Sequence, residues 1–179
     1  MTGPILALDL ATNTGWCEGI PGEKPTFGSV RLAYSGGTNP EAYETLFKFM
    51  SDRFALTRYQ MVIFEAPQSP SHMAGHSNAK TFRRLYGLVE MAEWVAHMHG
   101  YFGGRVREAN VHDVRKNLLG ARPPKGEAKK AVVGRLRGLG FDVKDDDAAD
   151  AVAVWLYASA LVDRKLAHAT DPLFAGRSD

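Results

Sequence analysis

The stretch KDDDAADAVAVW, residues 144–155, places four aspartates at the start of an alanine-rich apolar run. Such a run predicts a buried helix that begins at the aspartates. Asp147 and Asp150 are three residues apart, so a helix places both carboxylates on one face near its N-terminus. A helix cap uses one carboxylate and stabilises by up to about 1 kcal/mol, so capping explains a single aspartate rather than the group.

Two further acidic residues, Asp9 and Glu65, lie toward the ends of the apolar segments ILALDL and MVIFE. Burial of a carboxylate there costs on the order of several kcal/mol unless a cation or hydrogen-bond donors compensate it. Hard divalent cations, chiefly Mg²⁺ and Mn²⁺, prefer oxygen ligands of this kind. The candidate ligands are therefore four carboxylates: Asp9, Glu65, Asp147 and Asp150. Alternatively, Asp9 accepts hydrogen bonds from the turn TNTG, Glu65 pairs with an arginine, and the aspartates cap their helix.

Predicted strands and helices alternate along the chain, as is typical of an α/β domain. Strands are expected at residues 5–10, 15–20, 26–34, 61–66 and 104–109, and helices at about 40–54, 79–99, 111–119, 129–139 and from the aspartates onward. The turn ATNT makes the first two strands antiparallel. Asn39 is the expected cap of the first helix, and PQSPSHMAGHSNA is expected to be a mobile loop.

The 179 residues, 45% of them hydrophobic, are enough for one domain with a substantial core. We expect this domain to cover residues 1–163 and a weakly ordered tail to cover residues 164–179. No segment reaches the roughly 18 apolar residues of a membrane span, so a soluble protein is expected. Cys17 is the only cysteine, which excludes an internal disulfide and suits a reducing cytoplasm.

Positive charge is concentrated between Arg105 and Lys144. This segment contains eleven lysines and arginines and four acids, which gives it a local charge of +7 in a chain of net charge +2. A surface of this kind attracts phosphates without sequence preference. The alternative is a pair of well-solvated helices with no partner.

Three motifs, ILALDLATNTGW, VIFEAP and DDAADAVAVWLYA, resemble the acidic motifs of RuvC-type Holliday junction resolvases, which are endonucleases of the RNase H-like superfamily. The resemblance continues through EANVHDVRKNLLGARPPKGEAKKAVVGRLRGLG and spans about Ile5 to Leu161. It implies an RNase H-like α/β fold with a central mixed five-stranded sheet flanked by helices.

The resemblance also implies an active site and a substrate. Two Mg²⁺ or Mn²⁺ ions per site would be bound by the four catalytic carboxylates Asp9, Glu65, Asp147 and Asp150. The implied DNA contacts are Arg115 and Lys129, with Lys116 and Lys130 as close rivals. The implied activity is cleavage of four-way junctions or other branched DNA, which leaves 5′ phosphate and 3′ hydroxyl ends.

A homodimer is expected because a four-way junction has approximate two-fold symmetry and is cut on two strands. The helix at about 79–99 is the expected interface, since its family counterpart has that role. Phe82, Tyr86 and Trp94 add apolar surface there, and Gly87 allows close backbone approach. The alternative is that these aromatics cover only their own core.

The sequence departs from the family in two places. The family carries a stacking aromatic residue shortly after the second-motif glutamate, whereas this chain continues EAPQSPSHM and reaches Phe82 much later. Its first motif has Asp-Leu-Ala in place of Asp-Pro-Gly. This divergence resembles phage or prophage versions of the family, some of which act on branched DNA more broadly.

Three other functions remain open from the sequence. LALDLATNTG resembles the first phosphate loop of actin-like ATPases, although no second Asp-Gly-Gly loop follows. A non-catalytic DNA-binding module would not need four acids beside its basic surface. A YqgF-type RNA-processing nuclease is the runner-up within the superfamily.

Overall fold

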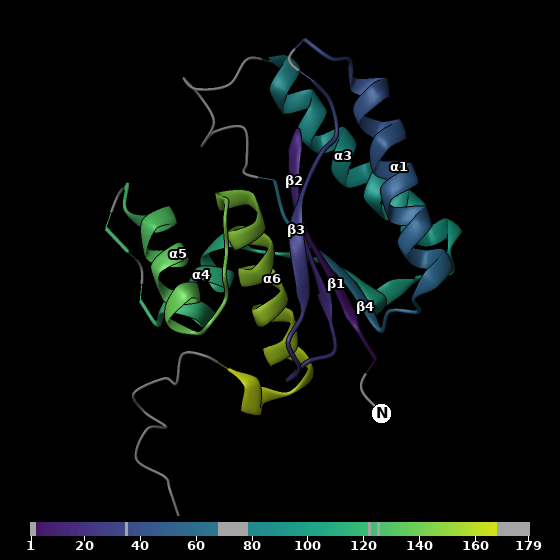
Figure 1. The fold of residues 1–179 in the computed structure, drawn as a ribbon. Coiled ribbons are helices and arrows are strands. Elements are labelled where there is room, and N and C mark those ends of the chain that lie inside the picture. Colours follow the sequence, from purple (N-terminus) through teal and green to yellow (C-terminus); the bar gives the residue numbers. More distant parts are fainter. Residues whose placement is uncertain (1–2, 35, 68–78, 122, 125, 168–179) are drawn as a thin grey trace, which may run out of the picture.

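A five-stranded sheet lies between two layers of helices in the computed structural model, which describes residues 3–34, 36–67, 79–121, 123–124 and 126–167 (Figure 1). The strands are β1 (Ile5–Asp9), β2 (Asn13–Gly19), β3 (Thr26–Arg31), β4 (Met61–Glu65) and β5 (Val106–Ala109), in the order β3-β2-β1-β4-β5. The pairs β1–β2 and β2–β3 are antiparallel, whereas β1–β4 and β4–β5 are parallel. The predicted mixed five-stranded α/β fold is confirmed.

Helices cover both faces of the sheet (Figure 1). α1 (Asn39–Leu56) and α3 (Ala79–Met98) lie on one face, and α4 (Val111–Leu119), α5 (Ala128–Gly138) and α6 (Asp146–Val162) lie on the other. These bounds agree with the expected helices to within about two residues. Most of the expected loop PQSPSHMAGHSNA and of the expected tail lies outside the described residues, although a short 3-10 turn, Arg164–Leu166, follows α6.

Alternation along the strands divides the apolar core into two clusters. Ile5 and Ala7 of β1 pack with the buried side of α6, whereas Leu6 and Leu8 pack with α1 and α3. β4 repeats this alternation from Met61 onward. Odd-numbered residues of both strands therefore face α6, and this fixes the direction of the residues that end them.

The cap of α1 differs from the predicted one. Thr38, not Asn39, is the N-cap: its side chain accepts a hydrogen bond from the Glu41 backbone N–H, and the Glu41 carboxylate accepts one from the Thr38 N–H at 2.7 Å. This capping box satisfies two backbone donors at once, which a single asparagine does not. Asn39 instead accepts a hydrogen bond from Arg84 Nε at 2.9 Å.

β1 and β4 are one residue shorter than predicted, and β3 and β5 are shorter by two residues or more. β3 ends at Arg31, although the Leu32 N–H still donates a hydrogen bond to the carbonyl of Thr12, at 2.8 Å, in the register of the β2–β3 pair. β5 begins only at Val106 because residues 103–105 form a 3-10 turn.

Gly87 of α3 faces Tyr43 of α1, and a Cβ atom at Gly87 would collide with the Tyr43 hydroxyl. The close approach expected at this glycine is therefore made within the chain, between α1 and α3, which alters its expected role at a dimer interface.

No helix among the described residues has the length and hydropathy required to cross a bilayer.

Candidate active site

Asp9 and Glu65 end two adjacent parallel strands, β1 and β4. Asp9 follows Ala7 by two positions and Glu65 follows Ile63 by two positions, and the side chains of Ala7 and Ile63 pack toward α6. Because side chains alternate along a strand, both carboxylates are directed to the α6 side of the sheet. Both are partly buried, whereas the residues before them are fully buried. The sheet thus brings two carboxylates from distant parts of the sequence to one edge, as the strand-end pattern predicts.

The four aspartates at the start of α6 make different contacts. Asp145 is the N-cap and accepts hydrogen bonds from the Ala148 N–H at 2.8 Å and from Ser29 Oγ at 3.2 Å. Asp146 forms an exposed ion pair of 3.5 Å with Lys129 of α5. The capping explanation therefore holds for one aspartate, which leaves Asp147 and Asp150 facing the sheet end.

Asp147 is held by a residue that the sequence analysis did not identify. The side-chain amide of Asn13, in β2, donates a hydrogen bond to Asp147 Oδ2. The backbones of β2 and α6 also approach each other closely next to this contact, because a Cβ atom at Gly15 would collide with the Asp147 carbonyl. Asn13 and Gly15 lie on the same face of β2, so this strand fixes where α6 begins.

Electrostatic interactions connect the carboxylates. Burial raises the pKa of Asp9 well above its ordinary value, and the charges of Glu65, Asp150 and Asp147 raise it further. Burial, followed by the charge of Asp150, raises the pKa of Glu65 to about 7. Burial also raises the pKa of Asp150, against the opposing effects of Lys129 and Arg115. Each carboxylate therefore makes the ionised form of another less favourable.

A hollow of about 300 Å³ opens beside Asp9 and Glu65. Its other walls are the chain after each strand and two residues of α3, namely Leu10, Ala11, Ala66, Pro67, Leu85 and Val89. The carboxyl ends of parallel strands are where α/β proteins commonly bind ligands. Asp9 and Glu65 thus border an open space at the end of the sheet, whereas Asp147 and Asp150 are not among its lining residues.

The chemistry of these side chains fits hard divalent cations. All four are carboxylates, the preferred ligands of Mg²⁺ and Mn²⁺, and a bound cation would offset the burial that raises the pKa values of Asp9, Glu65 and Asp150. Among the described residues, no three His, Cys, Asp or Glu side chains are gathered closely enough to form a metal-binding group. The carboxylates share one end of the sheet without closing into such a group.

The predicted basic residues divide into two pairs. Arg115 of α4 and Lys129 of α5 both lower the pKa values of Glu65 and Asp150, so both lie within electrostatic reach of the carboxylates. Lys116 and Lys130 are exposed, and neither is among the charges that shift these carboxyl groups. The structure therefore separates the two residues closer to the site from their neighbours in the sequence.

A pH dependence of stability follows from Glu65. Because its carboxyl has a pKa of about 7 in the folded protein and 4.5 ordinarily, the folded state binds the proton more tightly than the unfolded state. In EDTA the free energy of unfolding is expected to fall as the pH rises from about 4.5 to about 7, as measured by urea unfolding. Glu65→Gln should flatten this slope. An equal slope in the variant would show that Glu65 keeps an ordinary pKa.

No protein-family model and no curated protein sequence matches the chain. Among solved structures, Thermus thermophilus RuvC in complex with Holliday junction substrate is similar with a TM-score of 0.66 and 16% identity, over 89% of this chain and 95% of that chain. A second Thermus thermophilus RuvC structure has a TM-score of 0.64 and 17% identity, again over 89% of this chain and 95% of that chain. The yeast mitochondrial Holliday junction resolvase Ydc2 has a TM-score of 0.55 and 13% identity, over 93% of this chain and 83% of that chain. The chain thus has the RNase H-like α/β fold of RuvC-type resolvases.

Proposed function

We propose that the protein is a metal-dependent endonuclease that cuts Holliday junctions or other branched DNA. One observation carries the proposal: Asp9 and Glu65 end adjacent parallel strands on the face where Asp150 of α6 raises the pKa of both. An all-carboxylate site beside basic helices suits phosphodiester hydrolysis. The structural neighbours named for Holliday junctions support the same reaction class.

In the proposed mechanism, Asp9, Glu65, Asp147 and Asp150 bind two Mg²⁺ or Mn²⁺ ions. Such ions supply positive charge that offsets the anionic phosphodiester and acidify the attacking water, in a reaction that leaves 5′ phosphate and 3′ hydroxyl ends. Asn13 keeps the Asp147 carboxylate in one orientation through its amide hydrogen bond. Arg115 and Lys129 hold the DNA phosphates near the carboxylates.

The proposal is tested with synthetic substrates in the presence and absence of Mg²⁺. Four-way, three-way, flap and linear duplex DNA are compared with a structured RNA of equal length. Preferential, Mg²⁺-dependent cleavage of the branched DNAs is expected. Cleavage of the RNA alone would favour the RNA-processing alternative, and DNA binding without cleavage would favour a non-catalytic module.

Removing either basic residue beside the site should weaken DNA binding. Arg115→Ala and Lys129→Ala are expected to raise the junction Kd by about 5- to 10-fold at low salt, because each phosphate contact releases counterions, and by less at high salt. The measurement is fluorescence anisotropy of a labelled junction across a salt series.

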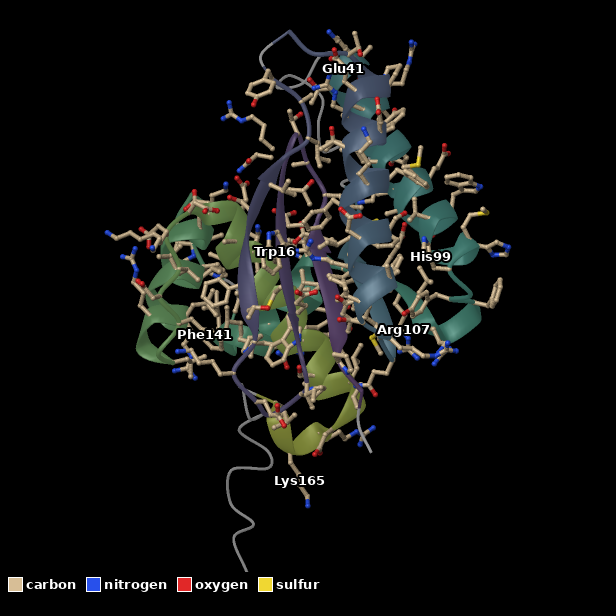
Figure 2. The ribbon with its side chains drawn as sticks, turned by 45° about the vertical axis from the view of Figure 1, so that its right-hand side comes forward. Trp16, Glu41, His99, Arg107, Phe141 and Lys165 are labelled. Carbon is tan, nitrogen blue, oxygen red and sulfur yellow. The ribbon has the colours of Figure 1, made fainter. Side chains whose placement is uncertain are left out.

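Matched controls for these substitutions lie just beyond the far end of α6. Arg164→Ala and Lys165→Ala remove the same charges from the exposed turn that follows α6 (Figure 2). Arg53 is unsuitable because its guanidinium lies 4.3 Å from the Trp16 ring and 3.8 Å from the Phe49 ring and pairs with Glu18 at 3.5 Å, so its removal would disturb packing. Equal losses in all four variants would contradict a local DNA surface.

A homodimer is also proposed, through the exposed apolar surface of α1 and α3. Trp94 and Met98 of α3 are 49% and 63% exposed, and Phe47 of α1 lies beside Trp94 with ring centroids 6.0 Å apart. Phe82 and Tyr86, in contrast, are partly buried and stack on each other at 4.5 Å. Contiguous exposed apolar surface of this kind favours association.

Trp94→Glu is expected to convert the dimer to a species near 19.6 kDa in analytical ultracentrifugation at micromolar concentration, because a buried charge would oppose the interface. Leu161→Glu is the control, since Leu161 is similarly exposed, at 44%, on α6 in the other helical layer. A wild-type monomer that junction DNA and metal leave unchanged would refute the dimer.

A further inference from the structure

A second and larger hollow, of about 510 Å³, lies between α4 and the start of α5. Gly120, with a φ of 75°, ends α4, and Gly126, with a φ of 86°, precedes α5. Both have backbone conformations that glycine adopts readily, so the connection turns sharply at each end. Both glycines line the hollow.

The walls of this hollow combine apolar and polar groups. Ala121, Pro123, Pro124 and Ala128 provide apolar surface, and the polar groups come from α4, namely His112, Asp113, Arg115 and Lys116. Its volume falls in the range of about 300–1,000 Å³ that holds small organic ligands. A nucleobase has flat apolar faces, a polar edge and an attached phosphate, and these walls offer a partner for each.

The position of the hollow connects it with the carboxylate site. Arg115 lines the hollow, and its helix α4 begins two residues after Ala109, which is the β5 partner of Glu65. A DNA strand with a phosphate at the carboxylates therefore has a neighbouring nucleotide within reach of the hollow. Lys116, also on the wall, provides a second cation for the phosphate of that nucleotide.

We propose that this hollow accepts one base displaced from the stack of the strand being cut. The proposal rests on the nuclease function proposed above and adds a base-binding pocket to it. Displacement of a base costs least where the base is already unpaired or poorly stacked, and branch points in DNA provide such bases. The pocket would thus help to select where in a branched substrate the strand is cut.

The test uses 2-aminopurine, a base analogue whose fluorescence rises when it leaves the stack. It is placed in turn at each nucleotide around the cut site of a four-way junction, bound to the full-length Glu65→Gln protein in Mg²⁺ so that cleavage does not interfere. A several-fold rise is expected at one nucleotide adjacent to the cut.

The matched variants narrow the hollow without adding a quenching ring. Ala121→Leu combined with Ala128→Leu, in the Glu65→Gln background, is expected to return the fluorescence to the level of free DNA. Ala55→Leu, on the exposed surface of α1, should leave the rise unchanged. Circular dichroism checks that each variant is folded.

A thermodynamic cycle gives a second readout. An abasic site at the responding nucleotide removes the proposed ligand, so the Leu substitutions should then have no further effect on the junction Kd. Junction binding with no 2-aminopurine rise at any position, or a rise that survives the Leu substitutions, would overturn the pocket while the nuclease function stands. Failure to bind any branched DNA would overturn both proposals.

Discussion

Cleavage of branched DNA is expected to fall by more than about 100-fold when Asp9 is replaced by Asn, Glu65 by Gln or Asp150 by Asn. Each substitution keeps the shape of the side chain and removes one negative charge from the site. Because the basic surface is unchanged, the junction Kd should stay near the wild-type value. Single-turnover cleavage and anisotropy, measured on the same preparations in Mg²⁺, separate the two effects.

The aspartates of α6 provide internal controls for this result. Asp145→Asn should cleave almost normally, because Asn also caps helices and Asp145 faces the Ala148 N–H and Ser29 rather than the carboxylates. Asp146→Asn should also be mild, since its ion pair with Lys129 is exposed. Asp147→Asn should be severely impaired. Near-normal turnover by a variant of Asp9, Glu65 or Asp150 would refute the four-carboxylate site.

These substitutions should also stabilise the protein in the absence of metal. Glu65→Gln removes a charge whose burial, next to Asp150, raises the pKa of the carboxyl to about 7. When one substitution raises the stability of the protein and lowers its activity, the replaced residue serves function at a cost to stability. This combination would distinguish a metal site from four acids that serve only as structural hydrogen-bond acceptors.

The strand-end acids could be predicted from the sequence because their signal is local. An acid that ends an apolar strand is visible within about six residues, and the spacing of Asp147 and Asp150 defines one helical face. The parallel pairing of β1 with β4, which the sequence did not specify, then places Asp9 and Glu65 at one end of the sheet. The capping box of Thr38 and Glu41 is equally local in the sequence, and it is the feature that makes Thr38, rather than the predicted Asn39, the N-cap.

Other features could not be predicted because their partners are distant in the sequence. Asn13 and Asp147 are 134 residues apart, and nothing near Asn13 indicates which residue its amide will meet. The same holds for Gly87, whose missing side chain makes room for Tyr43 rather than for a second subunit. Small and neutral residues acquire such roles only through tertiary packing, so their contribution becomes visible once the layers are assembled.

Gly15 packs directly against the backbone of a proposed catalytic residue, because a Cβ atom at Gly15 would collide with the carbonyl group of Asp147. Gly15→Ala is therefore expected to lower the free energy of unfolding by at least about 2 kcal/mol, since backbone atoms of α6 cannot move aside as a flexible side chain can. α6 would be displaced at the turn that carries Asp147 and Asp150. Urea unfolding and cleavage assays measure the two losses.

The matched control is Gly28→Ala in the neighbouring strand β3, paired with Trp16 of β2. The nearest atom to a new Cβ there is in the Trp16 ring, at 3.3 Å, so a small shift of that ring relieves the contact and the expected loss is below about 1 kcal/mol. Cleavage by Gly28→Ala should be nearly normal. If Gly15→Ala were as stable and active as this control, α6 would not be seated by the close approach at Gly15, and the orientation of Asp147 would depend on Asn13 alone.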